Sequence, residues 1–397
     1  MTKPKFTIVL DDSAFSISEG PRLKIWTLLA KSLFDQEDRP AIHLISRSGA
    51  LDNYADVIYR FPPWKPYWAQ HDRDQVDLVL ESLVSSVYVS SGYNFSTQSP
   101  NIGFEYDSFT KPEVTDTDDL GQIQRTVARE LFDWTFRFFS DAIIDPASRH
   151  TKDTERSSLI RIGGDTSTFF PRLANEVAFV TQQKGILRES YAIALSNMTQ
   201  PRITERLVSE WAGVDSAIQL VLVVVDSNLA ATKWGQYPRE QVLYVEANDF
   251  ELAHLYSGAL FSLQSSAEEQ MGFALLEAQM CGTPCAYTSE SLIERGFSSD
   301  LGVSIPALDK GSLGGLIDSQ FWLEERNRPK SRVLIRASNN IWEESARAVI
   351  DKAEEIIGIQ PRAFHYICDR TGISLNESFL KAEARAATIR HRSLRGK

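Results

Sequence analysis

The sequence predicts an α/β protein with two doubly wound domains, each a largely parallel sheet covered by helices on both faces. Three observations predict this class. Short apolar runs of strand length alternate with helical patterns along most of the chain, which is typical of parallel sheets. The chain has 397 residues, which is too many for one ordinary core. A glycine-containing break between Leu159 and Pro171 separates two such series.

The first series begins with "KFTIVL" (Lys5–Leu10), a short apolar strand. After a polar loop, the apolar residues between Leu23 and Leu33 recur at helical spacing. Further strands are expected in Ala41–Ser46, the end of Asp77–Gly92, Asn101–Asp107 and Asp141–Ser148. We therefore assign residues 1–170 to an N-terminal domain.

The second series follows the same alternation. Its strands are expected in Ser190–Asn197, Ile218–Asp226, Val242–Ala247 and Ala259–Gln264, with helices from about Thr204, from about Phe250 and from Phe273 to a cap at Gly282. Ligands of open parallel sheets bind outside the carboxyl ends of the strands, so two such sheets are expected to face a central ligand-binding cleft. We assign residues 171–355 to this domain and residues 356–397 to a C-terminal helical tail.

Composition excludes several classes of function. The net charge of -11 argues against a nucleic-acid partner, because such proteins offset phosphate charge with clustered Lys and Arg. Three cysteines and six scattered histidines indicate neither a disulfide framework nor a zinc site. So few cysteines predict a protein of the reducing cytoplasm. Cys281 and Cys285 are expected to be buried small residues. No signal peptide and no run of about 18 apolar residues is found.

The tail beyond Ile356 is basic toward its end. A basic terminal helix can rest on anionic lipid, which would make the protein peripheral at a membrane. A solvated tail is the alternative, because the apolar face of the tail is thin.

The stretch "SSAEEQMGFALLEAQMCGTPC" predicts a loop at the carboxyl end of a strand, followed by a helix. The start of this helix exposes the amides of Met271, Gly272 and Phe273, which suit a diphosphate. Glu277, deeper in the helix, can accept hydrogen bonds from both hydroxyls of a ribose. Glu269, in the loop, can accept hydrogen bonds from a sugar. The alternative is a solvated pair of carboxylates on a surface helix.

These residues resemble the signature of the retaining glycosyltransferases of family 4, which have the GT-B fold of two Rossmann-like domains. The matching positions are Glu269, Glu277, Ala278, Gly282, Thr283 and Pro284. A second match, to the segment between the domains of that family, comprises Gly164, Asp165, Phe169 and Pro171. The resemblance covers roughly residues 5–355 and is strongest between Glu246 and Thr288.

The resemblance implies a hexosyltransferase that moves a sugar from a UDP- or GDP-sugar to a glycan, lipid-linked or protein acceptor. It also implies retention at the anomeric carbon and no cofactor or metal. By position, Glu277 would hold the ribose, the amides of Met271 and Gly272 the sugar and diphosphate, and Glu269 the donor sugar. Arg202, near the position of the family's lysine, would neutralise the leaving diphosphate. Arg202 and Glu269 are the two residues expected to be catalytic.

Four further positions complete the expected binding site. Gly20, in "SISEGPR", resembles the loop of the first domain that admits the acceptor and the donor phosphate. Asn197 stands where the family has an arginine, and Gln270 begins the pair that replaces the usual Gly-Phe. The loop that carries Glu105 lacks the histidine that the family often places there.

These departures keep other functions open. One alternative is a catalytically impaired sugar-nucleotide-binding subunit that supports a partner enzyme. A sugar-nucleotide epimerase or a phosphorylase on the same fold is another. A nicotinamide dehydrogenase is disfavoured, because the loop after the first strand has no Gly-x-Gly-x-x-Gly turn.

Overall fold

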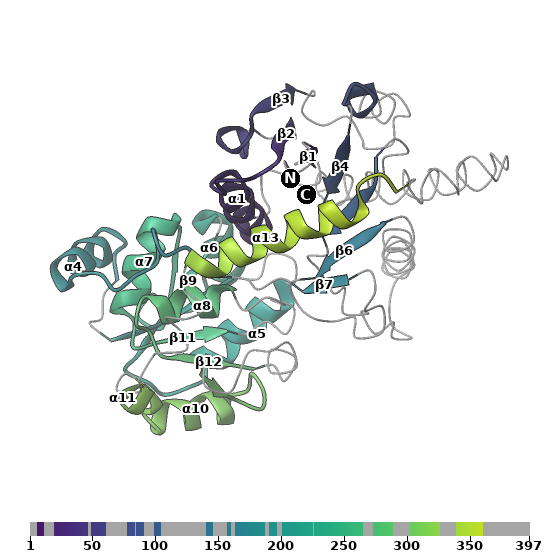
Figure 1. Cartoon of the computed structure of the whole chain (residues 1–397). Helices are drawn as coiled ribbons and strands as arrows, with labels where there is room; N and C mark the ends of the chain where they lie inside the picture. Colours follow the sequence, from purple (N-terminus) through teal and green to yellow (C-terminus); the bar gives the residue numbers. More distant parts are fainter. Residues whose placement is uncertain are drawn as a thin grey trace, which may run out of the picture. The chain divides into compact units, whose positions relative to one another are not determined.

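The computed structural model describes residues 6–11, 20–46, 49–60, 78–83, 85–90, 99–104, 140–145, 157–159, 163–186, 190–196, 201–224, 226–264, 273–288, 302–325 and 339–359. The chain divides into two compact units (Figure 1). The first consists of Met1–Arg161 with Trp342–Lys397, and the second of Ile162–Ile341. Each contains one parallel sheet, so the predicted α/β class is confirmed.

The unit boundaries differ from the expected ones at 170 and 355. The glycine-containing break belongs to the second unit, because Phe169 is 1% exposed and packs in a core there with Tyr256. Helix α13 (Asn339–Ile356) begins in the second unit and continues into the first from Trp342. The chain thus returns to its first unit before the predicted end of the second domain.

The sheet of the first unit has the strand order β3-β2-β1-β4-β5-β6-β7, and all neighbouring strands are parallel. Its strands are β1 (Thr7–Asp11), β2 (Ala41–Ser46), β3 (Val57–Arg60), β4 (Ser86–Ser90), β5 (Asn101–Phe104), β6 (Ala142–Asp145) and β7 (Ser157–Leu159). Helix α1 (Gly20–Phe34) and the short helix η1 (Asp52–Tyr54) also belong to this unit. The order reverses between β1 and β4, which makes the sheet doubly wound.

The sheet of the second unit has the order β10-β9-β8-β11-β12-β13 and is also parallel. Its strands are β8 (Tyr191–Leu195), β9 (Gln219–Val223), β10 (Val242–Val245), β11 (Phe261–Gln264), β12 (Cys285–Tyr287) and β13 (Val303–Ser304). Strand order reverses between β8 and β11, so the topological switch point lies there.

Helices cover both faces of this second sheet. They are α4 (Ala174–Gln183), α5 (Pro201–Ala212), α6 (Ser227–Trp234), α7 (Asp249–Gly258), α8 (Phe273–Met280), α10 (Lys310–Asp318) and α11 (Phe321–Glu325). Ile193 and Val221 pack in one core cluster with residues of α4, α7 and α8. Their sequence neighbours Ala192, Leu220 and Leu222 pack in another with residues of α5, α6, α10 and α11. This alternation is why the strands are apolar on both sides.

Helix α5 begins earlier than the sequence predicted. It starts at Pro201 and not near Thr204. Proline fits the first position of a helix, because its fixed φ is helical and it has no N–H to leave unpaired. The earlier start places Arg202 in the first turn of the helix.

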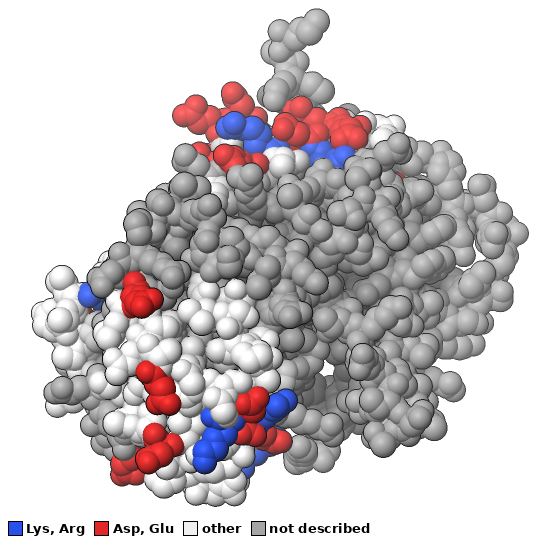
Figure 2. Space-filling model, turned by 90° about the horizontal axis from the view of Figure 1, so that it is seen from below, with Lys and Arg blue, Asp and Glu red and all other residues white. Residues whose placement is uncertain are grey.

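Charges of both signs are interspersed on the described surface. On the face that Figure 2 shows, described Lys and Arg side chains lie beside Asp and Glu and form no continuous basic patch. Within the described part of the chain, no helix combines the length and the apolar character needed to cross a membrane. The basic end of the tail, residues 360–397, lies outside the described residues.

Candidate functional site

The switch point of the second sheet brings two helix starts to one edge. The chain leaves β8 at Leu195 and begins α5 at Pro201, and it leaves β11 at Gln264 and begins α8 at Phe273. Because β8 and β11 are parallel neighbours, their carboxyl ends lie at the same edge of the sheet. Ligands of doubly wound sheets bind at such a point, and helix starts there present unpaired amides and a partial positive charge.

The structure describes four of the predicted site residues. Arg202 is the second residue of α5, Phe273 is the first residue of α8, and Glu277 lies in the middle of α8. Gly20 is the first residue of α1, in the first unit. The other six lie outside the described residues: Glu105, Asn197, Glu269, Gln270, Met271 and Gly272.

Glu277 is buried. Its exposed fraction is 3%, and every residue of α8 from Ala274 to Met280 is buried. The alternative of a solvated surface helix is therefore wrong for this carboxylate. A charge inside a protein is costly unless polar groups surround it, so burial of this kind marks a position with a specific polar role.

The charge of Glu277 acts on the next turn of the helix. Burial raises the pKa of Cys281 to about 12, and the negative charge of Glu277 adds to the rise. A hydrogen bond with Ser257 and the positive charge of Arg172 oppose it. Cys281 and Cys285 are both buried and form no disulfide, as the sequence predicted. Cys281 is thus a protonated thiol at neutral pH.

Helix α8 ends in a Schellman motif. Gly282 has a φ of 89°, its N–H donates to the carbonyl of Gln279 at 2.9 Å, and the N–H of Thr283 donates to that of Ala278 at 3.0 Å. The hydroxyl of Thr283 also donates to the carbonyl of Tyr256, near the end of α7. The Gly-Thr-Pro part of the matched signature therefore has a structural explanation as a helix end.

The second matched segment packs on α8. A Cβ added to Gly164 would lie 2.0 Å from Sδ of Met280, so the side chain of Met280 packs in the space that a larger residue would need. Asp165 stabilises the following turn, since its Oδ1 accepts from the N–H of Ser167 at 3.0 Å. Phe169 then enters the core, with its ring centroid 6.3 Å from that of Tyr256. The two matched segments are thus parts of one packed region.

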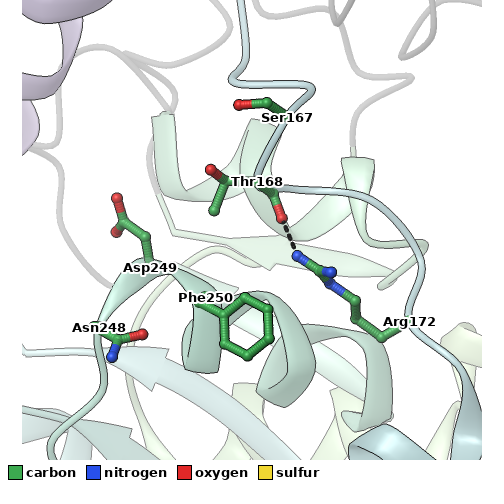
Figure 3. Close-up of a pocket in the computed structure, with 6 residues that line it drawn as sticks. All are labelled: Ser167, Thr168, Arg172, Asn248, Asp249 and Phe250. Carbon is green, nitrogen blue, oxygen red and sulfur yellow. Dashed lines mark hydrogen bonds between the residues drawn. The ribbon is translucent and has the colours of Figure 1, made fainter.

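A cavity of about 690 Å³ that is open to solvent lies at the surface of the second unit, at the start of α7 (Figure 3). It is lined by Ser167, Thr168, Arg172, Asn248, Asp249 and Phe250. Nη2 of Arg172 donates to the carbonyl of Thr168 at 2.6 Å. The guanidinium also lies 3.8 Å from the ring centroid of Phe170 and 5.0 Å from that of Phe250.

The sequence analysis missed this cavity. The two segments that line it are about 80 residues apart, and the matched segment that contains Ser167 and Thr168 was interpreted only as the connection between the domains. One signal was available: Asn248–Phe250 follow the expected strand Val242–Ala247, and the carboxyl ends of parallel strands are where ligands bind.

The switch point of the first sheet holds a buried polar pair. Asp11 is the last residue of β1 and is 1% exposed, and Tyr88 of β4 is fully buried. The hydroxyl of Tyr88 donates a short hydrogen bond to Oδ2 of Asp11. Thr7–Asp11 and Ser86–Ser90 pair in register, so this bond links the two strands between which the order reverses.

Several solved structures resemble the chain over most of its length. HepE from Anabaena, solved with UDP-glucose, aligns over 87% of this chain and 99% of its own, with a TM-score of 0.65 and 13% identity. Sucrose-phosphate synthase from Thermosynechococcus elongatus aligns over 89% and 97%, with a TM-score of 0.59 and 15% identity. UDP-GlcNAc 2-epimerase from Methanocaldococcus jannaschii aligns over 87% and 99%, with a TM-score of 0.53 and 11% identity.

No family model matches the sequence, and no curated protein matches it. The likeness to solved structures concerns the fold, because identity is low throughout. Two doubly wound parallel sheets, one in each unit, and alignment over nearly the whole chain establish that this protein has the GT-B fold.

Proposed function

We propose that this protein is a glycosyltransferase that moves a sugar from a UDP- or GDP-sugar to an acceptor hydroxyl, with retention and without a metal. The observation that carries the proposal is the buried carboxylate of Glu277 in a helix that starts at the switch point of a GT-B sheet. The complex of HepE with UDP-glucose supports a nucleotide sugar as the ligand class. Retention and metal independence rest on the sequence resemblance.

The proposed donor site uses both helix starts. The diphosphate would lie against the start of α8, at the amides of Met271, Gly272 and Phe273. Glu277 would accept hydrogen bonds from the ribose hydroxyls. Glu269 would hold the donor sugar, beside Gln270.

Arg202 and Gly20 would serve the diphosphate and the acceptor. As the anomeric bond breaks, negative charge develops on the diphosphate, and Arg202 in the first turn of α5 would stabilise it more in the transition state than in the ground state. Asn197 would stand beside it as a neutral donor. Gly20 and Glu105 would belong to the acceptor side, where a glycan, lipid-linked or protein hydroxyl attacks.

The test is calorimetry with a panel of UDP- and GDP-sugars on the wild type and on Glu277→Gln. The substitution keeps the shape of the side chain but removes the charge that the ribose hydroxyls would donate to. We expect at least one sugar nucleotide to bind, with affinity about 10- to 100-fold weaker in the variant. A wild type that binds none of the panel would exclude the donor site.

Activity measurements distinguish an active glycosyltransferase from a catalytically impaired binding subunit. We expect release of the nucleoside diphosphate with a suitable acceptor, unchanged by EDTA, and an NMR spectrum of the product that shows the donor's anomeric configuration. The substitution of asparagine for the expected arginine at position 197 favours the second candidate, a binding subunit that supports a partner enzyme. Tight sugar-nucleotide binding without hydrolysis or transfer would support that candidate.

A further inference from the structure

A buried glutamine lies at the switch point of the second sheet. Gln264 is the last residue of β11, and its side chain is 6% exposed. Side chains alternate between the two faces of a strand, and Leu263 packs in the core cluster that includes residues of α5 and α10. Gln264 therefore lies on the opposite face, where the core includes residues of α7 and α8. This is the face on which α8 packs, and α8 carries Glu277.

The neighbours of Gln264 across the sheet are apolar or aromatic. Ser262 pairs with Ile193, so Gln264, two residues further along, lies level with Leu195 of β8. On the other side, Gln264 pairs with Tyr287 of β12. Leu195 and Tyr287 both pack with the core cluster on this face. The amide is thus set into an otherwise apolar surface at the carboxyl edge of the sheet.

The side-chain amide of Gln264 has no hydrogen-bond partner among the residues that the structure describes. Burial of an amide without a partner is costly, and nearly all buried polar groups in proteins are bonded. Gln219 shows the usual arrangement: it is fully buried at the amino end of β9, and its Nε2 donates to the carbonyl of Arg239 at 2.6 Å. Gln264 therefore has an unused donor and acceptor at the edge where ligands bind.

Tyr287, the last residue of β12, provides a second unused polar group. Its side chain is 2% exposed, and within the described part of the chain its hydroxyl has no hydrogen-bond partner. Because Tyr287 pairs with Gln264, the two side chains lie next to each other on the same face. Burial raises the pKa of Tyr287, so its hydroxyl keeps its proton at neutral pH and can donate.

This pair of residues lies beside the start of α8. The helix takes the chain from the carboxyl end of β11 back to the amino end of β12, so it begins at the carboxyl edge of the sheet. Its Leu275 and Leu276 pack in the same cluster as Tyr287. The segment between Gln264 and α8 contains Glu269, which is proposed to hold the donor sugar. The pair therefore adjoins the sugar end of the proposed donor site.

On the basis of the proposed function, we infer that Gln264 and Tyr287 bind hydroxyl groups of the transferred sugar and that this sugar is a neutral hexose. An amide and a phenol both donate and accept hydrogen bonds, as sugar hydroxyls do, whereas a diphosphate only accepts them. The only charged residue of α8 is Glu277. A sugar that carries a carboxylate would meet this like charge, and the pair offers no cation to offset it.

The experiment is calorimetry on the full chain with UDP, GDP, UDP-glucose, UDP-galactose, GDP-mannose and UDP-glucuronate. We expect UDP-glucuronate to bind at least about tenfold more weakly than the best neutral donor. Gln264→Leu and Tyr287→Phe should each weaken that donor about 3- to 10-fold, because each leaves a sugar hydroxyl unpaired. Both variants should bind the matching nucleoside diphosphate within a factor of about two of the wild type, because that ligand has no sugar to lose contact with.

Gln219→Leu is the matched control, because it replaces a buried glutamine at the opposite edge of the same sheet. It leaves the carbonyl of Arg239 without its donor, so it should lower the melting temperature by about 2–4 °C and leave the donor affinity unchanged. Gln264→Leu removes an unpartnered amide, so the melting temperature of the ligand-free protein should stay the same or rise. A fall as large as that of the control would show a structural role for Gln264 and contradict the inference.

The outcomes distinguish this assignment from the proposed function. If the wild type binds a neutral nucleotide hexose and both variants bind it equally well, only the assignment of Gln264 and Tyr287 fails. Equal weakening of the hexose donor and its nucleoside diphosphate would also overturn it, because the pair would then act on the diphosphate. UDP-glucuronate that binds as tightly as the neutral donors would exclude the neutral hexose. A wild type that binds none of these probes would overturn the proposed function and this assignment together.

Discussion

At the scale of single residues, one position of the matched motifs is explained by packing. Gly164 resembles a family position, yet its contact is with Sδ of Met280 and not with a ligand loop. Met280 is 8% exposed, so its side chain has little room to move away from an added methyl group. The glycine thus leaves the space that the side chain of Met280 occupies.

Gly164→Ala should lower the free energy of unfolding by about 1–2 kcal/mol, because overpacking in a close-packed core forces neighbouring side chains from their rotamers. Urea denaturation measures the change. The control is a double-mutant cycle with Met280→Ala, which removes the clashing sulfur. We expect the second substitution to recover about 1 kcal/mol of the cost of the first. Strictly additive effects would contradict the contact.

Cys281 makes the free energy of unfolding depend on pH above about pH 9. Its folded-state pKa of about 12 exceeds that of an unfolded thiol, so above pH 9 the unfolded chain binds fewer protons. Stability contributed by the protonated thiol is therefore present below pH 9 and is lost between pH 9 and about 12. Cys281→Ala should lose stability less steeply over this window, by up to about 1.4 kcal/mol per pH unit.

Urea denaturation of the wild type and Cys281→Ala at pH 7, 9 and 10 measures this difference. Parallel pH dependence of the two proteins would show that the thiol does not titrate differently on folding. In the native protein at pH 8, we also expect thiol reagents to react with Cys281 only after denaturant is added.

At the scale of elements, the end of α8 shows why the signature contains a glycine. Gly282 has a positive φ, and its Schellman bonds satisfy the last carbonyls of the helix before the chain turns into β12. Because this turn also brings Thr283 to the carbonyl of Tyr256, it joins the ends of α7 and α8. The helix end therefore fixes where Glu277 stands relative to the strands.

Gly282→Ala should destabilise the protein by about 1 kcal/mol or more, because an L side chain in the left-handed region clashes with the following carbonyl. Gly315→Ala is a matched control inside α10, where an added Cβ would meet nothing within 4 Å. It should be neutral or stabilising by up to about 1 kcal/mol. Thermal denaturation of both variants measures the contrast, and equal losses would contradict it.

At the scale of the whole molecule, the two units differ in continuity. The second unit is one uninterrupted segment, Ile162–Ile341, whereas the first also needs the chain from Trp342 onward. In α13, Ala346, Val349 and Ala353 are fully buried, and Trp342 is 5% exposed. The first unit therefore depends on a helix that is encoded far from the rest of it.

Truncation after Ile341 should destabilise the first unit and leave the second folded, because it removes the buried face of α13 from the first unit only. Limited proteolysis with mass spectrometry measures this: fragments from residues 1–161 should appear early, while a core near residues 162–341 should persist. Equal digestion of both units would contradict the division.

The sequence by itself determined the α/β class, the positions of most strands along the chain and the position of Glu277 in a helix. The spacing of apolar residues and the positions of glycines are local properties, so they can be recognised in one sequence. Strands β3, β7, β12 and β13 were not assigned, because each is too short to show a strand pattern in the sequence. The roles of Asn197, Glu269 and residues 270–272 stay predictions.

Only the tertiary structure decided that Glu277 is buried and that the chain from Trp342 onward belongs to the first unit. It also decided that Arg172 and Asp249 line the same cavity. Each of these depends on contacts between segments tens to hundreds of residues apart. Periodicity reports which face of an element is apolar, but burial of a polar side chain depends on what packs over that face. That information arises only when the sheet and its helices are assembled.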